Sequence, residues 1–144
     1  MLVVREGLVR ETLRVLYCCG RERSECVVLW SGPLDASDLV DEVLHPAHDV
    51  GAHGYEIDPD WMHRLWVDLS EQRRCLRAQV HTHPRGAFHS PTDDEFPAVH
   101  TPGFVSLVVP AFARPPLDVA SIHASVVGPD GWLRSSFPKE VRVV

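Results

Sequence analysis

The chain has 144 residues, and its 14 Lys and Arg against 20 Asp and Glu give a formal net charge of −6. With 44% hydrophobic and 24% charged residues, it has the composition of a globular protein, which excludes disordered, collagen-like and disulfide-scaffold classes. We expect a single domain over residues 1–144, because this length is sufficient to bury a core. The acidic balance argues against nucleic acid as a partner. No apolar run reaches the roughly 18–20 residues of a membrane span, so we expect no membrane partner.

Charged residues interrupt the first 20 positions, so we expect no signal peptide and a cytoplasmic location. The four cysteines contain no CxxC pair, and we expect buried thiols of a reducing cytosol instead of a metal knuckle or a disulfide framework. Lys139 is the only lysine beside 13 arginines, a bias that suggests a GC-rich bacterial genome. The cysteines are Cys18, Cys19, Cys26 and Cys75.

Apolar residues at helical spacing predict helices over about residues 5–18 and 59–73, the second beginning with Asp58 as N-cap and Pro59 as first helical residue. Apolar runs predict strands near 25–30, 39–44, 76–83 and 104–109, and a hairpin over 122–127 and 132–137. In the strand near 76–83, alternation predicts that Leu76, Ala78 and Val80 share one face. Residues 45–54 are rich in Gly, Ala and His, which is typical of an exposed, mobile loop. This order of elements indicates a mixed α/β domain.

The strand near 76–83 ends in His81-Thr82-His83-Pro84, and Ser90 and Asp93 follow. Histidines at i and i+2 share one face of a strand, close enough to hold one metal ion. A carboxylate returning from the next loop would complete two imidazoles, one carboxylate and a position for water, the ligand set of a catalytic Zn²⁺ site. Each half also has a plain structural interpretation: solvated strand histidines, and a helix start capped at Ser90. Their co-occurrence favours the metal site.

The segment HTHPRGAFHSPTD resembles the JAMM motif (HxHP, a loop, then SxxD) of the JAB/MPN metalloproteases. Glu25, heading ECVVLWSG, matches the family's upstream glutamate, and the resemblance extends from about Val3 to Val127. It implies an α/β (α+β) fold with a single MPN/JAB-like domain, a mixed curved β-sheet flanked by helices in a cytidine-deaminase-like sandwich.

The resemblance also assigns roles. His81, His83 and Asp93 would bind one Zn²⁺ with a catalytic water, Glu25 would act as general base and then acid, and Ser90 would donate a hydrogen bond to the oxyanion. The loop between His83 and Ser90 is one residue shorter than usual, which makes Asp94 a competing ligand. Glu22 competes with Glu25 but lies in a charged turn.

The remaining histidines carry a weaker signal. His45, His48 and His53 suggest a second metal site, but in a Gly-rich segment we expect them to be solvated. His89 and His100 lie near the motif, where they could line the site.

The resemblance implies a bacterial JAB protease that hydrolyses the peptide or isopeptide bond after the C-terminal tail of a ubiquitin-like protein. Such enzymes are encoded beside ubiquitin-like, E1-like and E2-like proteins, some in antiphage-defence operons. We expect residues 45–54 to bind the tail of the ubiquitin-like protein. Two alternatives stay open: maturation of a sulfur-carrier protein, and an inactive MPN-type interaction scaffold.

Overall fold

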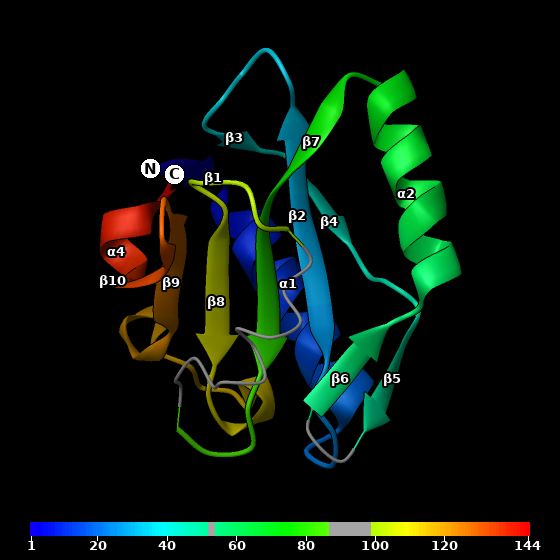
Figure 1. Cartoon of the computed structure of the whole chain (residues 1–144). Coiled ribbons are helices and arrows are strands. Elements are labelled where there is room, and N and C mark those ends of the chain that lie inside the picture. The colour runs from blue at the N-terminus through cyan, green and yellow to red at the C-terminus, as the bar shows by residue number, and fades with distance from the viewer. Residues whose placement is uncertain (52–53, 87–98) are drawn as a thin grey trace.

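The computed structural model describes residues 1–51, 54–86 and 99–144. Among these residues, the two long helices lie in the first half of the chain, with five short or medium strands between them, and strands dominate the second half (Figure 1). The elements are β1 (Leu2–Val4), α1 (Glu6–Gly20), β2 (Val27–Pro33), β3 (Leu39–Val40), β4 (Glu42–Leu44), β5 (His48–Gly51), β6 (Gly54–Ile57), α2 (Pro59–Glu71), β7 (Arg74–Thr82), β8 (Val105–Val109), 3₁₀ turns at Ala111–Ala113 and Val119–Ser121, β9 (His123–Gly128), β10 (Gly131–Ser136), α4 (Phe137–Glu140) and β11 (Val141–Val143).

A six-stranded mixed sheet forms the centre, in the order β10-β9-β8-β7-β2-β4. Its central strand β7 runs antiparallel to β2 and parallel to β8. A three-stranded parallel sheet, β11-β1-β3, brings the two ends of the chain together, and β5 and β6 form a separate antiparallel pair. This α+β architecture confirms the predicted fold class.

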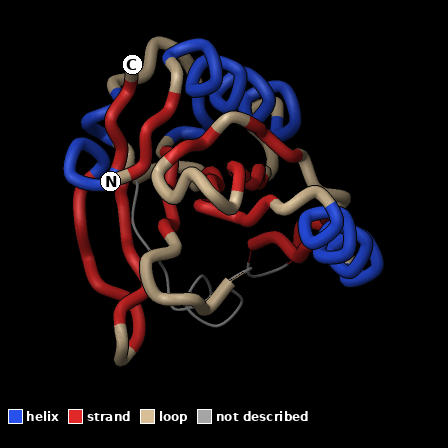
Figure 2. The backbone as a smooth tube through the Cα atoms, turned by 90° about the horizontal axis from the view of Figure 1, so that it is seen from above, coloured by secondary structure: helices blue, strands red, loops and turns tan. Residues whose placement is uncertain are grey.

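An apolar core packs against each face of the central sheet. Alternation along β2 directs Val28 and Trp30 into the core that α1 covers, and Leu29 into a smaller core with Leu65 and Leu69 of α2. Helix α1 lies behind the strands in Figure 1 and α2 beside β2 and β4, and Figure 2 shows both outside the strand layer. Among the described residues, no helix has the length and hydropathy needed to span a bilayer.

A buried polar chain fixes α1 on the sheet. The indole Nε1 of Trp30 donates to the Thr12 hydroxyl at 2.8 Å, and that hydroxyl donates to the Leu8 carbonyl at 2.9 Å. Trp30 and Thr12 are each 1% exposed, so water cannot replace either partner. The hydroxyl satisfies the indole N–H that this core would otherwise leave unpaired.

Replacing Thr12 by Val should lower the free energy of unfolding by about 1–3 kcal/mol, because the buried indole N–H of Trp30 would lose its acceptor. Chemical denaturation of both proteins measures the difference. Thr12→Ser keeps the hydroxyl and should retain more stability than Thr12→Val. Equal stability of the wild type and Thr12→Val would show that the hydrogen bond contributes nothing.

The structure confirms both long predicted helices, the capped start of α2 and the C-terminal hairpin. Asp58 accepts a hydrogen bond from the Asp60 backbone at 3.1 Å, with Pro59 at the start of α2. The predicted strand near 39–44 is divided into β3 and β4. The sequence did not reveal β1 and β11, because three-residue strands carry too little periodicity. The helix start predicted at Ser90 lies outside the described residues.

Two local predictions were wrong. Residues 45–54 were expected to form an exposed, mobile loop, but β5 and β6 pair from His48↔Ile57 to Gly51↔Gly54, and residues 52–53 lie outside the described part of the chain. Leu76 was expected on the same face as Ala78 and Val80, but a bulge in the β2–β7 pairing shifts the register there. Leu76 therefore packs in the α2 core while Ala78 and Val80 pack in the α1 core.

Candidate metal and catalytic site

The two histidines of the motif lie side by side at the C-terminal end of β7. His81 is fully buried and His83 is 5% exposed, and their ring centroids are 5.2 Å apart. The i, i+2 spacing puts both rings on one face of the strand, as the sequence predicted. Two adjacent imidazoles are appropriate donors for Zn²⁺, so the described residues fit the ion that the motif implies.

Neighbouring backbone fixes the end of β7. The N–H of His83 donates to the Val109 carbonyl at 2.9 Å, and the His83 carbonyl accepts from the Phe112 N–H at 2.9 Å. Ala111, Phe112 and Ala113 have φ values of 51°, 51° and 60°, and in this left-handed turn the Phe112 N–H reaches the His83 carbonyl. Non-glycine residues adopt this conformation at an energetic cost, which is common beside functional sites.

Tyr55 of β6 is a neighbour of the motif that the sequence did not reveal. Its ring packs against His81, with centroids 5.2 Å apart. The β5–β6 hairpin thus forms one wall beside the histidine pair. Sequence alone gave no signal for this contact, because it joins segments 26 residues apart through tertiary packing.

Glu25 lies directly before Cys26, at the end of β2 that neighbours the histidines. The Cys26 N–H donates to the Thr82 hydroxyl at 2.9 Å, the Thr82 N–H donates to the Cys26 carbonyl at 3.1 Å, and Val27 pairs with His81. These bonds join Cys26 to Thr82, the residue between the two histidines. The half-buried Glu25 is the residue directly before Cys26. The position suits a group that acts beside the metal.

Glu22, the competing glutamate, has a different setting. It is exposed in the turn after α1, has a φ of 62°, and forms an ion pair with Arg114 at 3.3 Å. Ser90 and Asp93, together with the competing ligand Asp94, lie outside the described residues. The third ligand and the oxyanion donor therefore stay predictions from the motif.

The prediction of buried thiols outside any disulfide was wrong for the two cysteines that are paired and also for Cys18, whose side chain is exposed. Cys19 and Cys26 form a disulfide, with Cα atoms 6.1 Å apart, while Cys18 and Cys75 are free thiols. The imidazoles of His45 and His48 lie against this pair, so they are not merely solvated as expected. Partial burial lowers the pKa of His45, and the nearby His48 ring lowers it further. His53 lies outside the described residues.

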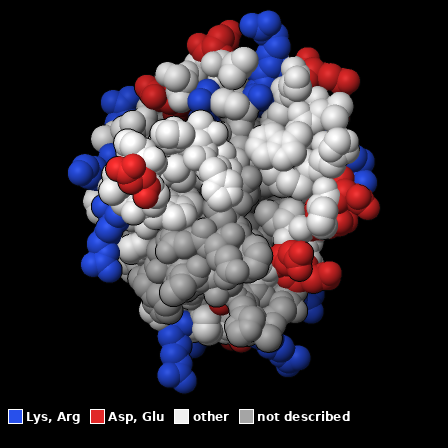
Figure 3. All heavy atoms as spheres, viewed as in Figure 1, with Lys and Arg blue, Asp and Glu red and all other residues white. Residues whose placement is uncertain are grey.

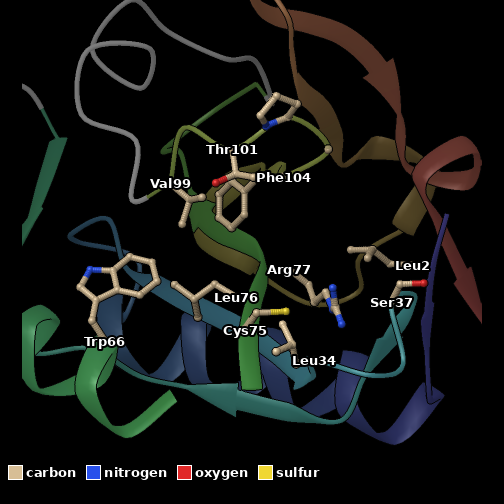
Figure 4. A pocket seen from close by; sticks show the side chains of 12 residues that line it. Leu2, Leu34, Ser37, Trp66, Cys75, Leu76, Arg77, Val99, Thr101 and Phe104 are labelled. Carbon is tan, nitrogen blue, oxygen red and sulfur yellow. The ribbon is translucent and has the colours of Figure 1, made fainter. Parts of the chain in front are cut away.

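A cavity of about 460 Å³ lies at the start of β7, at the opposite end of the strand from the histidines. Figure 4 shows Leu76 and Cys75 in its wall, with Trp66 of α2 and Phe104 at its sides. Its lining is mostly apolar and holds none of the motif residues, so the chemistry of the motif is not located there. On the face shown in Figure 3, acidic and basic side chains are interspersed, and no large patch of one sign appears.

Comparison with known proteins adds independent evidence. The chain is 38% identical over 110 residues to a probable metalloprotease of Sinorhizobium fredii, covering 73% of this chain and 68% of that protein. No family model matches the chain.

Solved structures are similar in fold. A protein of Desulfitobacterium hafniense is 18% identical, with a TM-score of 0.72 over 100% of this chain and 93% of that one. A JAB1/MPN domain protein of Archaeoglobus fulgidus is 17% identical, with a TM-score of 0.55 over 100% and 97%. The fold, the shared sequence and the HxHP strand lead to one conclusion: the chain belongs to the JAMM family of MPN/JAB-domain metalloproteases.

Proposed function

We propose that this metalloprotease is a zinc-dependent peptidase that cleaves the bond after the C-terminal tail of a ubiquitin-like protein, as a linear fusion or an isopeptide conjugate. The observation that carries the proposal is the pair of buried imidazoles, His81 and His83, with ring centroids 5.2 Å apart. With a carboxylate from Asp93, they would hold one Zn²⁺. When bound, the ion would supply Lewis-acid polarisation and a water whose pKa falls to about 7.

The protein's own groups would divide the remaining work. Glu25 would accept a proton from the attacking water and return it to the leaving amine. Ser90 would donate a hydrogen bond to the negative charge that develops on the carbonyl oxygen. Tyr55, packed on His81, restricts the orientation of that imidazole and limits solvent on one side of the pair.

The β5–β6 hairpin supports binding of an extended tail. In the described part of the chain, β5 and β6 pair only with each other, so no other strand is paired with the outer edge of either one. An extended peptide can add to such an edge, with main-chain hydrogen bonds supplying affinity. The hairpin contacts the histidine pair through Tyr55, so a tail bound along it would reach the proposed metal site.

The test uses a panel of bacterial ubiquitin-like proteins ending in Gly-Gly, each followed by a linear reporter or joined to a lysine by an isopeptide bond. We expect the zinc-loaded wild type to release the reporter, with mass spectrometry locating the cut after the Gly-Gly end. A chelator should abolish cleavage and added Zn²⁺ restore it.

The alternatives give different results in the same assay. Cleavage of a sulfur-carrier precursor without cleavage of any isopeptide conjugate would favour carrier maturation. A chain that contains zinc and yet cleaves no member of the panel would contradict the proposal and favour an interaction scaffold. A bacterial conjugation system and antiphage defence belong to the same proposal, and an E1-like or E2-like gene beside this one would support them.

A further inference from the structure

A second group of metal-ligating side chains lies outside the JAMM motif. Cys19, Cys26, His45 and His48 each offer one ligand atom, and these four atoms all lie within 4.8 Å of one another. Cys26 is fully buried, Cys19 and His48 are half-buried, and His45 is exposed at the edge. Two thiolates and two imidazoles are the ligand set of a closed structural zinc site.

The sulfur–nitrogen distances agree with tetrahedral coordination. Zn–S distances of about 2.3 Å and Zn–N distances of about 2.0–2.1 Å place sulfur and nitrogen ligands roughly 3.6 Å apart around one ion. In the structure, Sγ of Cys26 lies 3.3 Å from Nε2 of His45, and Sγ of Cys19 lies 3.6 Å from Nε2 of His48. The histidines are therefore placed at ligand spacing from the sulfurs.

A hydrogen bond orients His48 for this role. Its Nδ1 lies 2.9 Å from the Pro46 carbonyl oxygen, which can only accept, so Nδ1 carries the proton. In this tautomer of the neutral ring the lone pair is on Nε2, which is the ring atom 3.6 Å from Sγ of Cys19. Metal-binding histidines commonly fix their tautomer by donating the other ring N–H to a carbonyl.

The fold brings these four residues together from separate elements. Cys19 lies in the last turn of α1, Cys26 directly before β2, His45 directly after β4, and His48 at the start of β5. Because β2 and β4 are antiparallel, the beginning of one neighbours the end of the other. Cys26 belongs to the core on the α1 side, so the cluster lies on that side of the sheet.

The histidine pair of the motif lies on the other side. Val27, the residue after Cys26, pairs with His81, and the next residue on that face, Leu29, packs with α2. The Cys/His cluster and the JAMM motif are thus distinct sites, and they lie on opposite faces of the sheet at the start of β2.

We propose that in the reduced protein Cys19, Cys26, His45 and His48 bind a second, structural Zn²⁺, and that the Cys19–Cys26 disulfide is the alternative, metal-free state of the same site. A dithiol reductant would supply two electrons to break the S–S bond and become a disulfide itself, leaving two thiols. These thiols would release two protons on binding Zn²⁺. The bound ion would connect α1 and the start of β5 to the backbone that precedes β2, beside Glu25.

Cobalt substitution tests the site independently of proteolysis. The reduced wild-type chain, freed of metal and titrated with Co²⁺, should show thiolate-to-cobalt charge-transfer absorption. The proposed JAMM ligands contain no sulfur, so this signal reports only the Cys/His site. Oxidation of the thiols before titration should abolish it. In the variant lacking both His81 and His83, zinc analysis of the reduced protein should still find one ion per chain.

Matched variants define the ligands. Loss of a group that only orients a ligand costs about 10–100-fold in affinity, so Cys19→Ser and His48→Ala should weaken Co²⁺ binding by more than that. Cys18→Ser removes the neighbouring exposed thiol and should leave affinity and spectrum unchanged. If Cys19→Ser fails to fold, the wild-type comparison of reduced and oxidised chains decides.

Specific results would overturn the inference. It fails if reduced wild type binds Co²⁺ without thiolate absorption, or if Cys18→Ser and Cys19→Ser weaken binding equally. It also fails if the cysteines remain disulfide-bonded under reductant and bind no metal. None of these results depends on whether the JAMM motif cleaves a ubiquitin-like substrate.

Discussion

Replacing Glu25 by Gln should lower the rate of substrate hydrolysis by about 10²–10⁴-fold, the usual contribution of a general base. Gln has nearly the same size but cannot accept a proton from water. That loss corresponds to about 3–5 kcal/mol of transition-state stabilisation. Glu25 is proposed to act beside the metal and not to bind it, so the zinc content of the variant should equal that of the wild type. Steady-state cleavage of a fluorescent fusion and metal analysis measure the two quantities.

Glu22→Gln is the matched control. Glu22 lies three residues earlier and pairs with Arg114 at the surface, so this variant should retain wild-type activity. If Glu22→Gln loses activity and Glu25→Gln keeps it, the base has been assigned to the wrong glutamate. Equal cleavage by wild type and Glu25→Gln would contradict the mechanism itself.

Replacing His83 by Ala should remove the zinc proposed at the motif and reduce cleavage below detection. His83 is 5% exposed and its ring lies against that of His81, so the variant would remove one of the two buried imidazoles proposed to hold the ion. Without the ion, the pKa of water stays far above neutral, so little hydroxide is available at pH 7. Mass spectrometry of metal content, beside the activity assay, measures the effect.

His63→Ala serves as the control, because His63 is exposed on α2 and belongs to neither candidate metal site. Circular dichroism should show that both variants are folded. In reduced protein, His83→Ala should lose one zinc per chain and retain the ion at the Cys/His cluster. Full zinc content and full activity in His83→Ala would exclude His83 as a ligand.

The sequence was sufficient for features that depend on local spacing. Helix α2 could be predicted because Asp58 and Pro59 specify its start and apolar residues follow at helical spacing. The alternation along β7 predicted that His81 and His83 share a face, and the structure places their rings together. The family could be identified from HxHP and SxxD, since these residues are close in sequence and chemically specific.

Other features were decided by contacts between distant segments. The strands β1 and β11 form through parallel pairing of the chain ends, which no local pattern encodes. Residues 45–54 lack periodicity, yet His48–Gly51 pairs with Gly54–Ile57, and this pairing accompanies the contact of Tyr55 with His81. The bulge that turns Leu76 to the opposite core depends on the register with β2.

The Cys/His cluster shows the difference most clearly. The sequence contains two cysteines and two histidines over about 30 positions without a recognised ligand spacing, and each was reasonably expected to be a lone thiol or a solvated ring. Their meeting requires the turn after α1 and the antiparallel pairing of β2 with β4. Local chemistry determined which residues could bind a metal at the JAMM motif, whereas only tertiary packing, which joins positions far apart in the chain, assembled the second set of ligands.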